Sequence, residues 1–510
     1  MRVLFATAEA YPLAKTGGLA DVSRALPVAL RRLGLDVRLL MPGYPRAYVR
    51  VENPRIVAKI PPVLGVTDAT LVEGTFPETD LPVYLIDSPS LFRRNGGLYQ
   101  DDSGKDWPDN ALRFAFLARV GTEISMGRLA TGWKPDLVHA NDWHAGLLPL
   151  YLALEKDLRP STVFTTHNMA FQGNFPAHWL ETLGLPAACY QAGGVEFYNQ
   201  ISFLKAGLRY ADRVTTVSPT YAREILTPEF GFGMEGILRQ RGEDFVGILN
   251  GIDGALWNPA TDSMLARPFH TSDISGKRAC KSALQQELGL PAKPDTPVIG
   301  FVSRITHQKM ADVILEALPW LSQQDMQFVS VGEGDPSMEA GFDQARERYS
   351  TKTAVIIGYD EAVAHRLQAA ADILLAPARF EPCGLTQLYA LKYGTLPVVR
   401  RTGGLADTVV DATATSIADR TATGFVFDEA TKDELVSALS RALSLYREPL
   451  IWRRLQLQAM AQDFSWDASA TQYAALYSAA SGLPVNLGVE SKAIALTDQE
   501  NDKTSRALRG

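Results

Sequence analysis

The hexapeptide TGGLAD occurs twice in this chain of 510 residues, at positions 16–21 and again at 402–407. Each copy follows a cation, Lys15 or Arg401, and lies between an apolar, strand-like run and a helical start. A strand, a paired-glycine loop and a helix N-terminus together present free backbone N–H groups and a positive dipole end, which suit phosphate or another anion. The repeat therefore predicts two nucleotide-binding halves that face one cleft. The alternative is that the glycines only turn the chain from strand to helix.

Short apolar, β-branched runs alternate with helical stretches along most of the chain, which predicts an α/β fold with doubly wound parallel sheets. The expected strands are 3–7, 37–41, 137–140, 162–166, 213–217 and 245–249 in the first half, and 298–302, 327–331, 354–357, 373–376, 396–399 and 424–427 in the second. The expected helices include 19–33, 432–446, 450–462 and 468–478. Between 251 and 297 the alternation breaks, so we expect the domain junction there. The polar tail 481–510 is expected to be disordered.

Composition excludes several classes of protein. A net charge of -7 argues against nucleic acid as a partner, because nucleic-acid binders normally carry a basic face. The only three cysteines cannot form a disulfide framework or a CxxC zinc site. The apolar runs fall short of the ~20 residues that span a bilayer, and the first residues lack a signal-peptide pattern. We therefore expect a cytoplasmic protein with no membrane partner.

Two loops of the second half gather polar groups at predicted strand ends. SRITHQK places Arg304 and Lys309 where they could stabilise the charge of a pyrophosphate leaving group, although two solvated surface cations would look the same. In FEPCGLT, Glu381 could bond sugar hydroxyls or merely cap the helix that follows. The next residues could offer backbone N–H groups and one hydroxyl to phosphate: Cys383, Gly384, Leu385 and Thr386. The side chain of Cys383 could be a reactive thiol or a small packed group. Tyr359, after another strand, could stack on a base or pack within its own domain.

Two loops of the first half also follow predicted strands. NDWHAG contains Asp142, Trp143 and His144, and THNMAFQG contains His167 and Asn168. An aromatic ring among polar groups suits a sugar, but a single histidine is more often structural. The histidines are not spaced as metal ligands and no DxD triplet is present, so we expect no metal and no cofactor.

The longer motifs carry a resemblance to a known family. KTGGLADV, NDWHAG, THNMAFQG, NGID, SRITHQK, IGYDEA and RFEPCGLTQLYALKYGTLPVVRRTGGLADTV resemble the bacterial glycogen synthases and plant starch synthases over residues 1 to about 480. The resemblance implies a glycosyltransferase-B fold with two Rossmann-like domains. The first is 1–255, completed by a helix at 464–480, and the second is 256–463. It also implies retaining transfer of glucose from ADP-glucose to the non-reducing end of an α-1,4-glucan.

The resemblance further implies roles for individual residues. The expected catalytic residues are Lys15, His167, Arg304, Lys309 and Glu381. The donor would be bound by Lys15, Arg304 and Lys309 of this set together with Gly18, Asp21, Asn250, Tyr359, Cys383, Gly384, Leu385 and Thr386. The acceptor or sugar cleft would be lined by Asp142, Trp143, His144 and Asn168.

One residue departs from the family pattern, and two other functions remain open. Many relatives have glycine directly after the lysine of SRxTxQK, whereas this chain has Met310, which does not easily adopt a positive φ. A related transferase that uses UDP-glucose is one alternative. A non-catalytic protein that binds glucan or nucleotide is the other, and Met310 is its only support.

Overall fold

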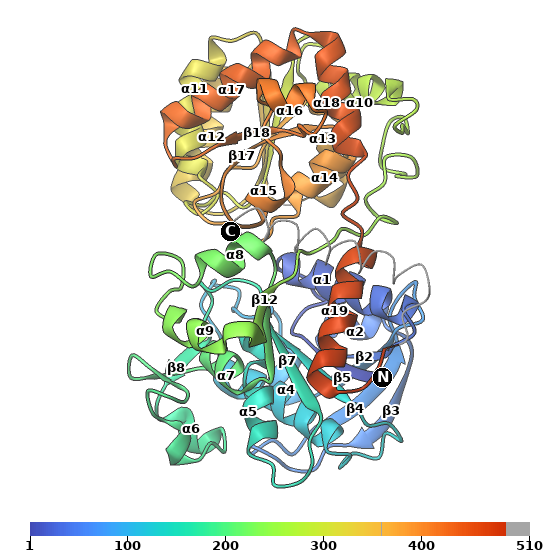
Figure 1. Ribbon diagram of the computed structural model, residues 1–510, viewed down its shortest axis with the longest axis vertical. Helices are drawn as coiled ribbons and strands as arrows, with labels where there is room; N and C mark the ends of the chain where they lie inside the picture. The colour runs from blue at the N-terminus through green and yellow to red at the C-terminus, as the bar shows by residue number, and fades with distance from the viewer. Residues whose placement is uncertain (359, 486–510) are drawn as a thin grey trace, which may run out of the picture. The chain divides into compact units, whose positions relative to one another are not determined.

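The computed structural model describes residues 1–358 and 360–485, and the chain divides into two compact units (Figure 1). Unit 1 comprises Met1–Gly251 together with the segment that begins at Trp466, and unit 2 comprises Ile252–Ser465. Tyr359 and most of the expected tail, residues 486–510, lie outside the described residues. None of the described helices is long and apolar enough to cross a membrane.

Unit 1 is built on a nine-stranded sheet in the order β12-β11-β7-β6-β1-β2-β5-β4-β3. Seven neighbouring strands run parallel, and β4 and β3 add an antiparallel edge. The strands are β1 Arg2–Ala6, β2 Asp36–Pro42, β3 Glu52–Lys59, β4 Thr70–Thr75, β5 Pro82–Asp87, β6 Leu137–Asn141, β7 Ser161–Thr166, β11 Arg213–Thr216 and β12 Phe245–Gly247. A separate antiparallel sheet consists of β8 Asn174–Pro176, β10 Gln200–Ser202 and β9 Glu196–Phe197.

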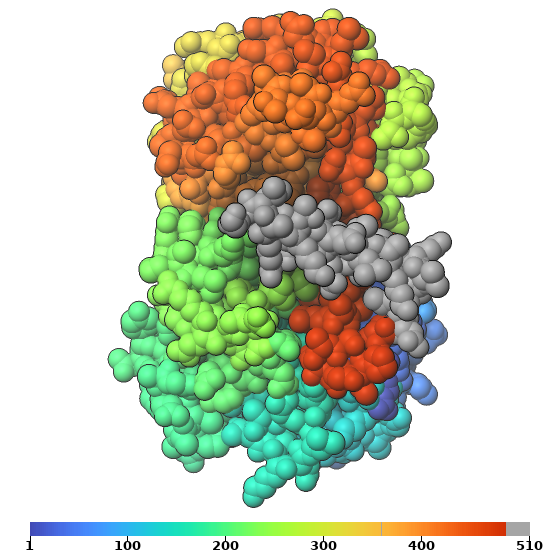
Figure 2. Space-filling model, viewed as in Figure 1, coloured from blue at the N-terminus to red at the C-terminus, as the bar shows by residue number. Residues whose placement is uncertain are grey.

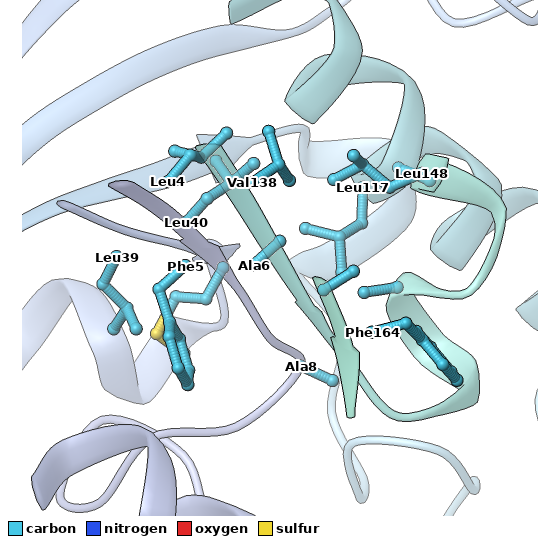
Figure 3. Close-up of a cluster of buried hydrophobic side chains, with 14 of the residues drawn as sticks. Leu4, Phe5, Ala6, Ala8, Leu39, Leu40, Leu117, Val138, Leu148 and Phe164 are labelled. Carbon is cyan, nitrogen blue, oxygen red and sulfur yellow. The ribbon is translucent and has the colours of Figure 1, made fainter. Parts of the chain in front are cut away.

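Apolar side chains on both faces of the parallel strands explain why helices cover the sheet. Figure 3 shows Phe5 and Leu39 on one side of β1, and Leu117 and Leu148, from two helices, on the other. The helices of unit 1 are α1 Gly18–Arg32, α2 Pro45–Arg50, α3 Pro89–Phe92, α4 Asn110–Ser125, α5 Leu147–Ala153, α6 Trp179–Thr182, α7 Phe203–Tyr210, α8 Pro219–Glu224, α9 Glu235–Arg241 and α19 Trp466–Ser481. Three short 3-10 turns occur at Trp143–Ala145, Ala187–Cys189 and Gly242–Asp244.

The last helix, α19, belongs to unit 1 although it is far away in sequence (Figure 2). It packs against α1 and β7. The hydroxyl of Tyr477 lies 2.6 Å from Nδ1 of His139 on β6, and Nε2 of the same ring lies 2.6 Å from Oγ1 of Thr165 on β7. Burial lowers the pKa of His139 to about 3, so this imidazole is neutral and joins α19 to the sheet by hydrogen bonds rather than by charge.

Unit 2 is built on a six-stranded parallel sheet in the order β15-β14-β13-β16-β17-β18. Its strands are β13 Val298–Val302, β14 Gln327–Gly332, β15 Thr353–Ile357, β16 Ile373–Leu375, β17 Leu396–Arg400 and β18 Phe425–Phe427. Its helices are α10 Ser275–Glu287, α11 Ala311–Ser322, α12 Pro336–Arg348, α13 Glu361–Ala370, α14 Thr386–Lys392, α15 Gly403–Thr408, α16 Ala414–Ala418, α17 Lys432–Tyr446 and α18 Pro449–Met460. The parallel sheets of the two units confirm the predicted α/β class. Doubly wound sheets generally bind ligands at the carboxyl ends of their strands.

Candidate active site

The first TGGLAD copy lies in the loop between β1 and α1, and a carboxylate from the same loop holds it. Glu9 is buried and accepts hydrogen bonds from the backbone N–H groups of Thr16 (2.6 Å) and Gly17 (3.3 Å). It also accepts from the Thr16 hydroxyl at 2.5 Å and from the hydroxyl of Tyr99. The expectation of free N–H groups in this loop is therefore wrong at Thr16 and Gly17, because the chain supplies its own anion there. Sequence reasoning missed Glu9, although an acidic residue seven positions before the glycine loop was visible.

Lys15 and Asp21 lie together on the outer side of this loop. Nζ of Lys15 is 3.0 Å from Oδ1 of Asp21 and 5.0 Å from the centroid of the Tyr11 ring. Both charged side chains are about one-quarter exposed. A Cβ built on Gly17 would meet no atom within 4 Å, so open space lies above the loop where a ligand could approach the backbone. This surface is the part of the first loop that suits an anion.

The carboxyl end of β6 lies between those of β1 and β7, because β6 pairs with both strands. Asp142, directly after β6, has φ 58° and accepts a hydrogen bond from the Trp143 N–H at 3.0 Å. Burial, and then the nearby charge of Glu9, raise the pKa of Asp142 to about 7. A carboxyl group that titrates near neutrality at a strand end is typical of functional sites.

The two predicted histidines differ in access to solvent. His144 is buried, with its ring 3.9 Å from that of Trp143 and 4.6 Å from that of Tyr99, and neither of its ring nitrogens has a hydrogen-bond partner among the described residues. His167 is partly exposed, and its Nε2 lies 3.1 Å from Oδ1 of Asn141. Protein atoms around His167 desolvate the ring and lower its pKa to about 3, so it is neutral at pH 7. His167 is thus the imidazole that a substrate could reach.

Two other predicted residues of unit 1 have defined environments. Asn168 follows His167, and its Oδ1 accepts a hydrogen bond from the Ala170 N–H at 3.0 Å, which shapes the loop. Asn250, near the end of the first segment of unit 1, is buried, and its Oδ1 has no partner within the described part of the chain. An unsatisfied buried carbonyl oxygen is costly, so a donor from a ligand would stabilise it.

In unit 2 the structure brings Lys309 and Glu381 into an ion pair. They are 72 positions apart in sequence and meet because β13 pairs directly with β16, which places the loops after these strands side by side. Further bonds hold the two loops together: Gln308 Nε2 donates to the Phe380 carbonyl at 3.2 Å. Glu381 does not cap the next helix, since α14 starts after Leu385 without a side-chain cap.

Arg304 shares a loop with Lys309 but has a different environment. Its side chain is exposed, and its Nη2 lies 3.3 Å from Oε1 of Gln308. The ammonium of Lys309 is balanced by the Glu381 carboxylate, so Arg304 gives this pair of loops a net positive charge at their surface. A cation at a strand's carboxyl end suits a phosphate ligand.

The second TGGLAD copy has a different role from the first. Gly403 has φ 43°, and a Cβ built on it would lie 1.8 Å from the carbonyl oxygen of Glu381. A Cβ on Gly404 would lie 2.2 Å from the carbonyl oxygen of Cys383, and the Gly404 N–H donates to the Glu381 carbonyl at 3.1 Å. The paired glycines therefore let this loop pack against the backbone that carries Glu381. The expected symmetry between the two copies does not extend to their surroundings.

The segment after Glu381 forms a tight turn into α14. Gly384 has φ 74°, which favours glycine, and Nε2 of Gln387 donates to the carbonyls of Cys383 and Gly384 at 3.0 Å each. The Cys383 side chain is buried, as expected for a packed residue, while Leu385 and Thr386 stand at the helix start. Among residues 1–358 and 360–485, no group of three or more His, Cys, Asp or Glu side chains is placed to hold a metal ion.

Met310 adopts the left-handed conformation that its side chain disfavours. It has φ 54° and ψ 32° at the N-cap of α11, and its side chain is fully buried in the core of unit 2. Left-handed backbone costs a non-glycine residue roughly 1–2 kcal/mol, while burial of a methionine side chain contributes roughly 1.5–3 kcal/mol. Core packing thus offsets the strain, and the loop that carries Lys309 has the turn that glycine would favour.

Comparison with known proteins covers nearly the whole chain. The family described as starch synthase catalytic domain matches residues 2–240, and the family described as glycosyl transferases group 1 matches residues 285–454. The chain is 53% identical to a glycogen synthase of Burkholderia thailandensis, over 93% of this chain and 90% of that protein. It is 49% identical to a glycogen synthase of Thioalkalivibrio sulfidiphilus, over 94% and 99% respectively. The catalytic domain of starch synthase IV from Arabidopsis thaliana, solved with ADP and acarbose, matches with a TM-score of 0.85 and 34% identity, over 94% of this chain and 99% of that one.

Proposed function

The chain belongs to the glycogen and starch synthase family, and from this membership we infer that it is a glycogen synthase, which transfers glucose from ADP-glucose to the non-reducing end of an α-1,4-glucan. The observation that carries the inference is the identity of about half of all residues with glycogen synthases over more than nine-tenths of the chain. The bound ADP in the starch synthase IV structure supports an adenine nucleotide as the donor.

In the proposed reaction, the cations of unit 2 act on the donor diphosphate. The bond between the sugar C1 and the phosphate oxygen breaks, and negative charge develops on ADP. The exposed guanidinium of Arg304 and the ammonium of Lys309 would stabilise this negative charge on ADP. Glu381, fixed by Lys309 and by the glycine loop behind it, would orient the glucose hydroxyls. We propose that these protein cations neutralise the diphosphate without a bound metal.

Unit 1 would supply the other contacts with the reacting sugar. Lys15 would meet the diphosphate above the open face of Gly17. His167 is neutral at pH 7, and its Nε2–H donates to Oδ1 of Asn141, so Nδ1 is left to accept a hydrogen bond from a sugar hydroxyl near C1. For retention, the acceptor O4 would attack C1 from the face that the phosphate leaves, and the departing phosphate oxygen would take the O4 proton. We further propose that the enzyme acts in the cytoplasm, consistent with three cysteines that are free thiols.

The first test is transfer of labelled glucose to glycogen by the purified protein, with ADP-glucose or UDP-glucose at equal concentration, and with or without EDTA. We expect incorporation from ADP-glucose that EDTA does not reduce. Incorporation from UDP-glucose alone would overturn the donor assignment, and loss of activity in EDTA would overturn the metal-free assignment. No incorporation from either donor would favour a protein that binds without catalysis.

The residue assignments have their own test. Glu381→Ala is expected to lower kcat far more than it raises the KM for ADP-glucose, because Glu381 would act on the reacting sugar. Arg304→Ala is expected to lower kcat and to raise that KM, because it would contact the diphosphate before and during transfer. Near-normal kcat in the Glu381 variant would remove it from the catalytic set.

A further inference from the structure

One arginine of unit 2, Arg379, joins the two loops that carry Lys309 and Glu381. Its Nη1 and Nη2 donate to Oδ1 and Oδ2 of Asp312, each at 2.8 Å, in the first turn of α11. Nη1 also donates to the His307 carbonyl at 2.5 Å. Two parallel hydrogen bonds to one carboxylate fix the orientation of a guanidinium as well as its position, so this contact is rigid.

The backbone beside Arg379 adds to the connection between the loops. The Arg379 N–H donates to the Gln308 carbonyl at 2.8 Å, and Nε2 of Gln308 donates back to the Phe380 carbonyl. The residues that Arg379 contacts in this loop and in α11 flank Lys309 on both sides, and Arg379 itself lies two positions before Glu381. A shift of Arg379 would therefore move Glu381 relative to Lys309.

A second arginine, Arg400, extends the connection to two more strands. It lies at the end of β17, which pairs with β16 on one side and with β18 on the other (Figure 1). Nη1 of Arg400 donates to the Arg379 carbonyl at 2.7 Å, and its Nε donates to the Asp428 carbonyl after β18 at 2.7 Å. The loops that follow four neighbouring strands, β13, β16, β17 and β18, are thereby joined in the order of the strands.

The contact between Arg379 and Asp312 is one between two charged groups. Burial raises the pKa of Asp312, but the hydrogen bonds and the charge of Arg379 outweigh it and leave that pKa below its usual value. The side chains of Arg379 and Asp312 are 25% and 30% exposed, so salt and water screen the pair less than a pair on an open surface. Hydrogen bonds between ionised groups are also stronger than neutral ones.

We propose that Arg379 is a positioning residue for glucose transfer, which keeps Glu381 in the place, relative to Lys309, that the donor sugar requires. The inference rests on the glycogen synthase function proposed above. Both terminal nitrogens of Arg379 already donate to protein acceptors, so Arg379 acts through its neighbours rather than on the substrate. Its effect is on the rate, because misplacement of a catalytic group by about 1 Å can lower a rate on the order of 100-fold.

The first test is a double-mutant cycle between Arg379 and Glu381. Arg379→Lys keeps the positive charge but cannot form the two parallel bonds to Asp312. We expect it to lower kcat about tenfold to 100-fold and to change the KM for ADP-glucose less than about threefold. In a Glu381→Ala background, the same substitution should lower kcat less than about threefold, because the group through which Arg379 acts is gone. A purely structural role would lower the Tm without this dependence on Glu381.

Another ion pair of unit 2 provides a matched control. Arg366 on α13 donates to Glu287 of α10 through Nε at 2.9 Å and through Nη2 at 2.7 Å, and the two side chains are 29% and 37% exposed. Arg366→Lys removes the same kind of paired contact away from the strand-end loops and should leave kcat at the wild-type value. Asp312→Asn keeps one acceptor for Arg379 but no charge, so we expect a smaller loss of kcat, roughly threefold to tenfold.

A crystal structure of Arg379→Lys tests the inference without reference to activity. We expect the ion pair between Lys309 and Glu381 to be broken, or the Glu381 carboxylate to be displaced by about 1 Å. An unchanged ion pair would overturn the inference. If the wild-type protein transfers no glucose, the proposed function fails, and this crystal structure still decides whether Arg379 positions Glu381.

Three kinetic results would also overturn the inference and would leave the proposed function intact. The first is a wild-type kcat in folded Arg379→Lys. The second is an equal loss of kcat with and without the Glu381 side chain, which would show that Arg379 acts independently of it. The third is a loss of kcat in Arg366→Lys as large as that in Arg379→Lys, which would assign the effect to any lost ion pair of unit 2.

Discussion

Alanine substitutions at one glycine of each TGGLAD copy would separate their two roles. In Gly403→Ala, the new methyl would be placed 1.8 Å from the Glu381 carbonyl oxygen, on a backbone with φ 43°. Left-handed backbone costs roughly 1–2 kcal/mol and overpacking against fixed backbone roughly 1–3 kcal/mol, so the free energy of unfolding of unit 2 should fall by about 2–5 kcal/mol. For a unit of roughly 200 residues, that corresponds to a Tm lower by roughly 4–20 °C. Displacement of Glu381 by about 1 Å would lower kcat on the order of 100-fold.

Gly17→Ala should behave in the opposite way. The backbone at Gly17 is extended, with φ -157°, and its Cβ position is open. The substitution should leave the Tm of unit 1 unchanged or raise it slightly, because alanine reduces the entropy of the unfolded chain. If the donor approaches Gly17 as proposed, the methyl should lower kcat/KM for ADP-glucose about tenfold or more.

The assay is calorimetric unfolding together with steady-state kinetics on both variants, with Gly236→Ala as control, since Gly236 also has no atom within 4 Å of its Cβ position. Wild-type Tm and kcat in Gly403→Ala would refute the packing role of the second copy. A lower Tm in Gly17→Ala would refute the open space at the Cβ position of Gly17 in the first copy.

Three further substitutions test other features of the site. Glu9→Gln should cost unit 1 about 1–2 kcal/mol, because neutral hydrogen bonds replace charge-assisted ones, and it should lower the pKa of Asp142, as followed by NMR titration. Met310→Gly should relieve roughly 1–2 kcal/mol of strain but lose about 1.5–3 kcal/mol of burial and leave a cavity, so urea unfolding should show net destabilisation with little change in kcat. In the folded wild-type protein Asp142 keeps its proton up to about pH 7, whereas in the unfolded chain it loses the proton near pH 4. The free energy of unfolding therefore falls as the pH rises from about 4 to about 7. Asp142→Asn keeps an acceptor for the Trp143 N–H and should therefore gain up to roughly 4 kcal/mol over wild type at pH 8 but not at pH 4.

The sequence predicted most of the parallel strands because their side chains are buried on both faces and read as continuous apolar runs. It did not predict β3, which is largely exposed, or β4, which carries a glutamate and a glycine, because neither has such a run. The helix expected at 432–446 agrees with α17, whose heptad-like apolar spacing is regular. The small sheet of β8, β9 and β10 was missed because its strands have only two or three residues.

The candidate site shows a similar division. Residue types in strand-end loops indicated Lys15, His167, Arg304, Lys309 and Glu381, since loops at the carboxyl edge carry function in doubly wound folds. The pairing of Lys309 with Glu381 depends on β13 lying next to β16, and strand order is not visible in a single sequence. The identical hexapeptides suggested identical tasks, but their surroundings differ. Glu9 of the same loop accepts hydrogen bonds from the first copy, whereas the backbone at Glu381 and Cys383 packs against the second.

The place of α19 has a consequence for synthesis of the protein. Unit 2 is inserted between the first segment of unit 1 and the helix that completes it. At translation rates of about 5–20 residues per second, Tyr477 is synthesised roughly 15–70 seconds after β6, and only then can it bond His139. Unit 2 is continuous in sequence and can fold during that interval, whereas unit 1 has an uncovered face on α1 and β7 throughout it. The last unit to finish folding is therefore the one that the ribosome begins first.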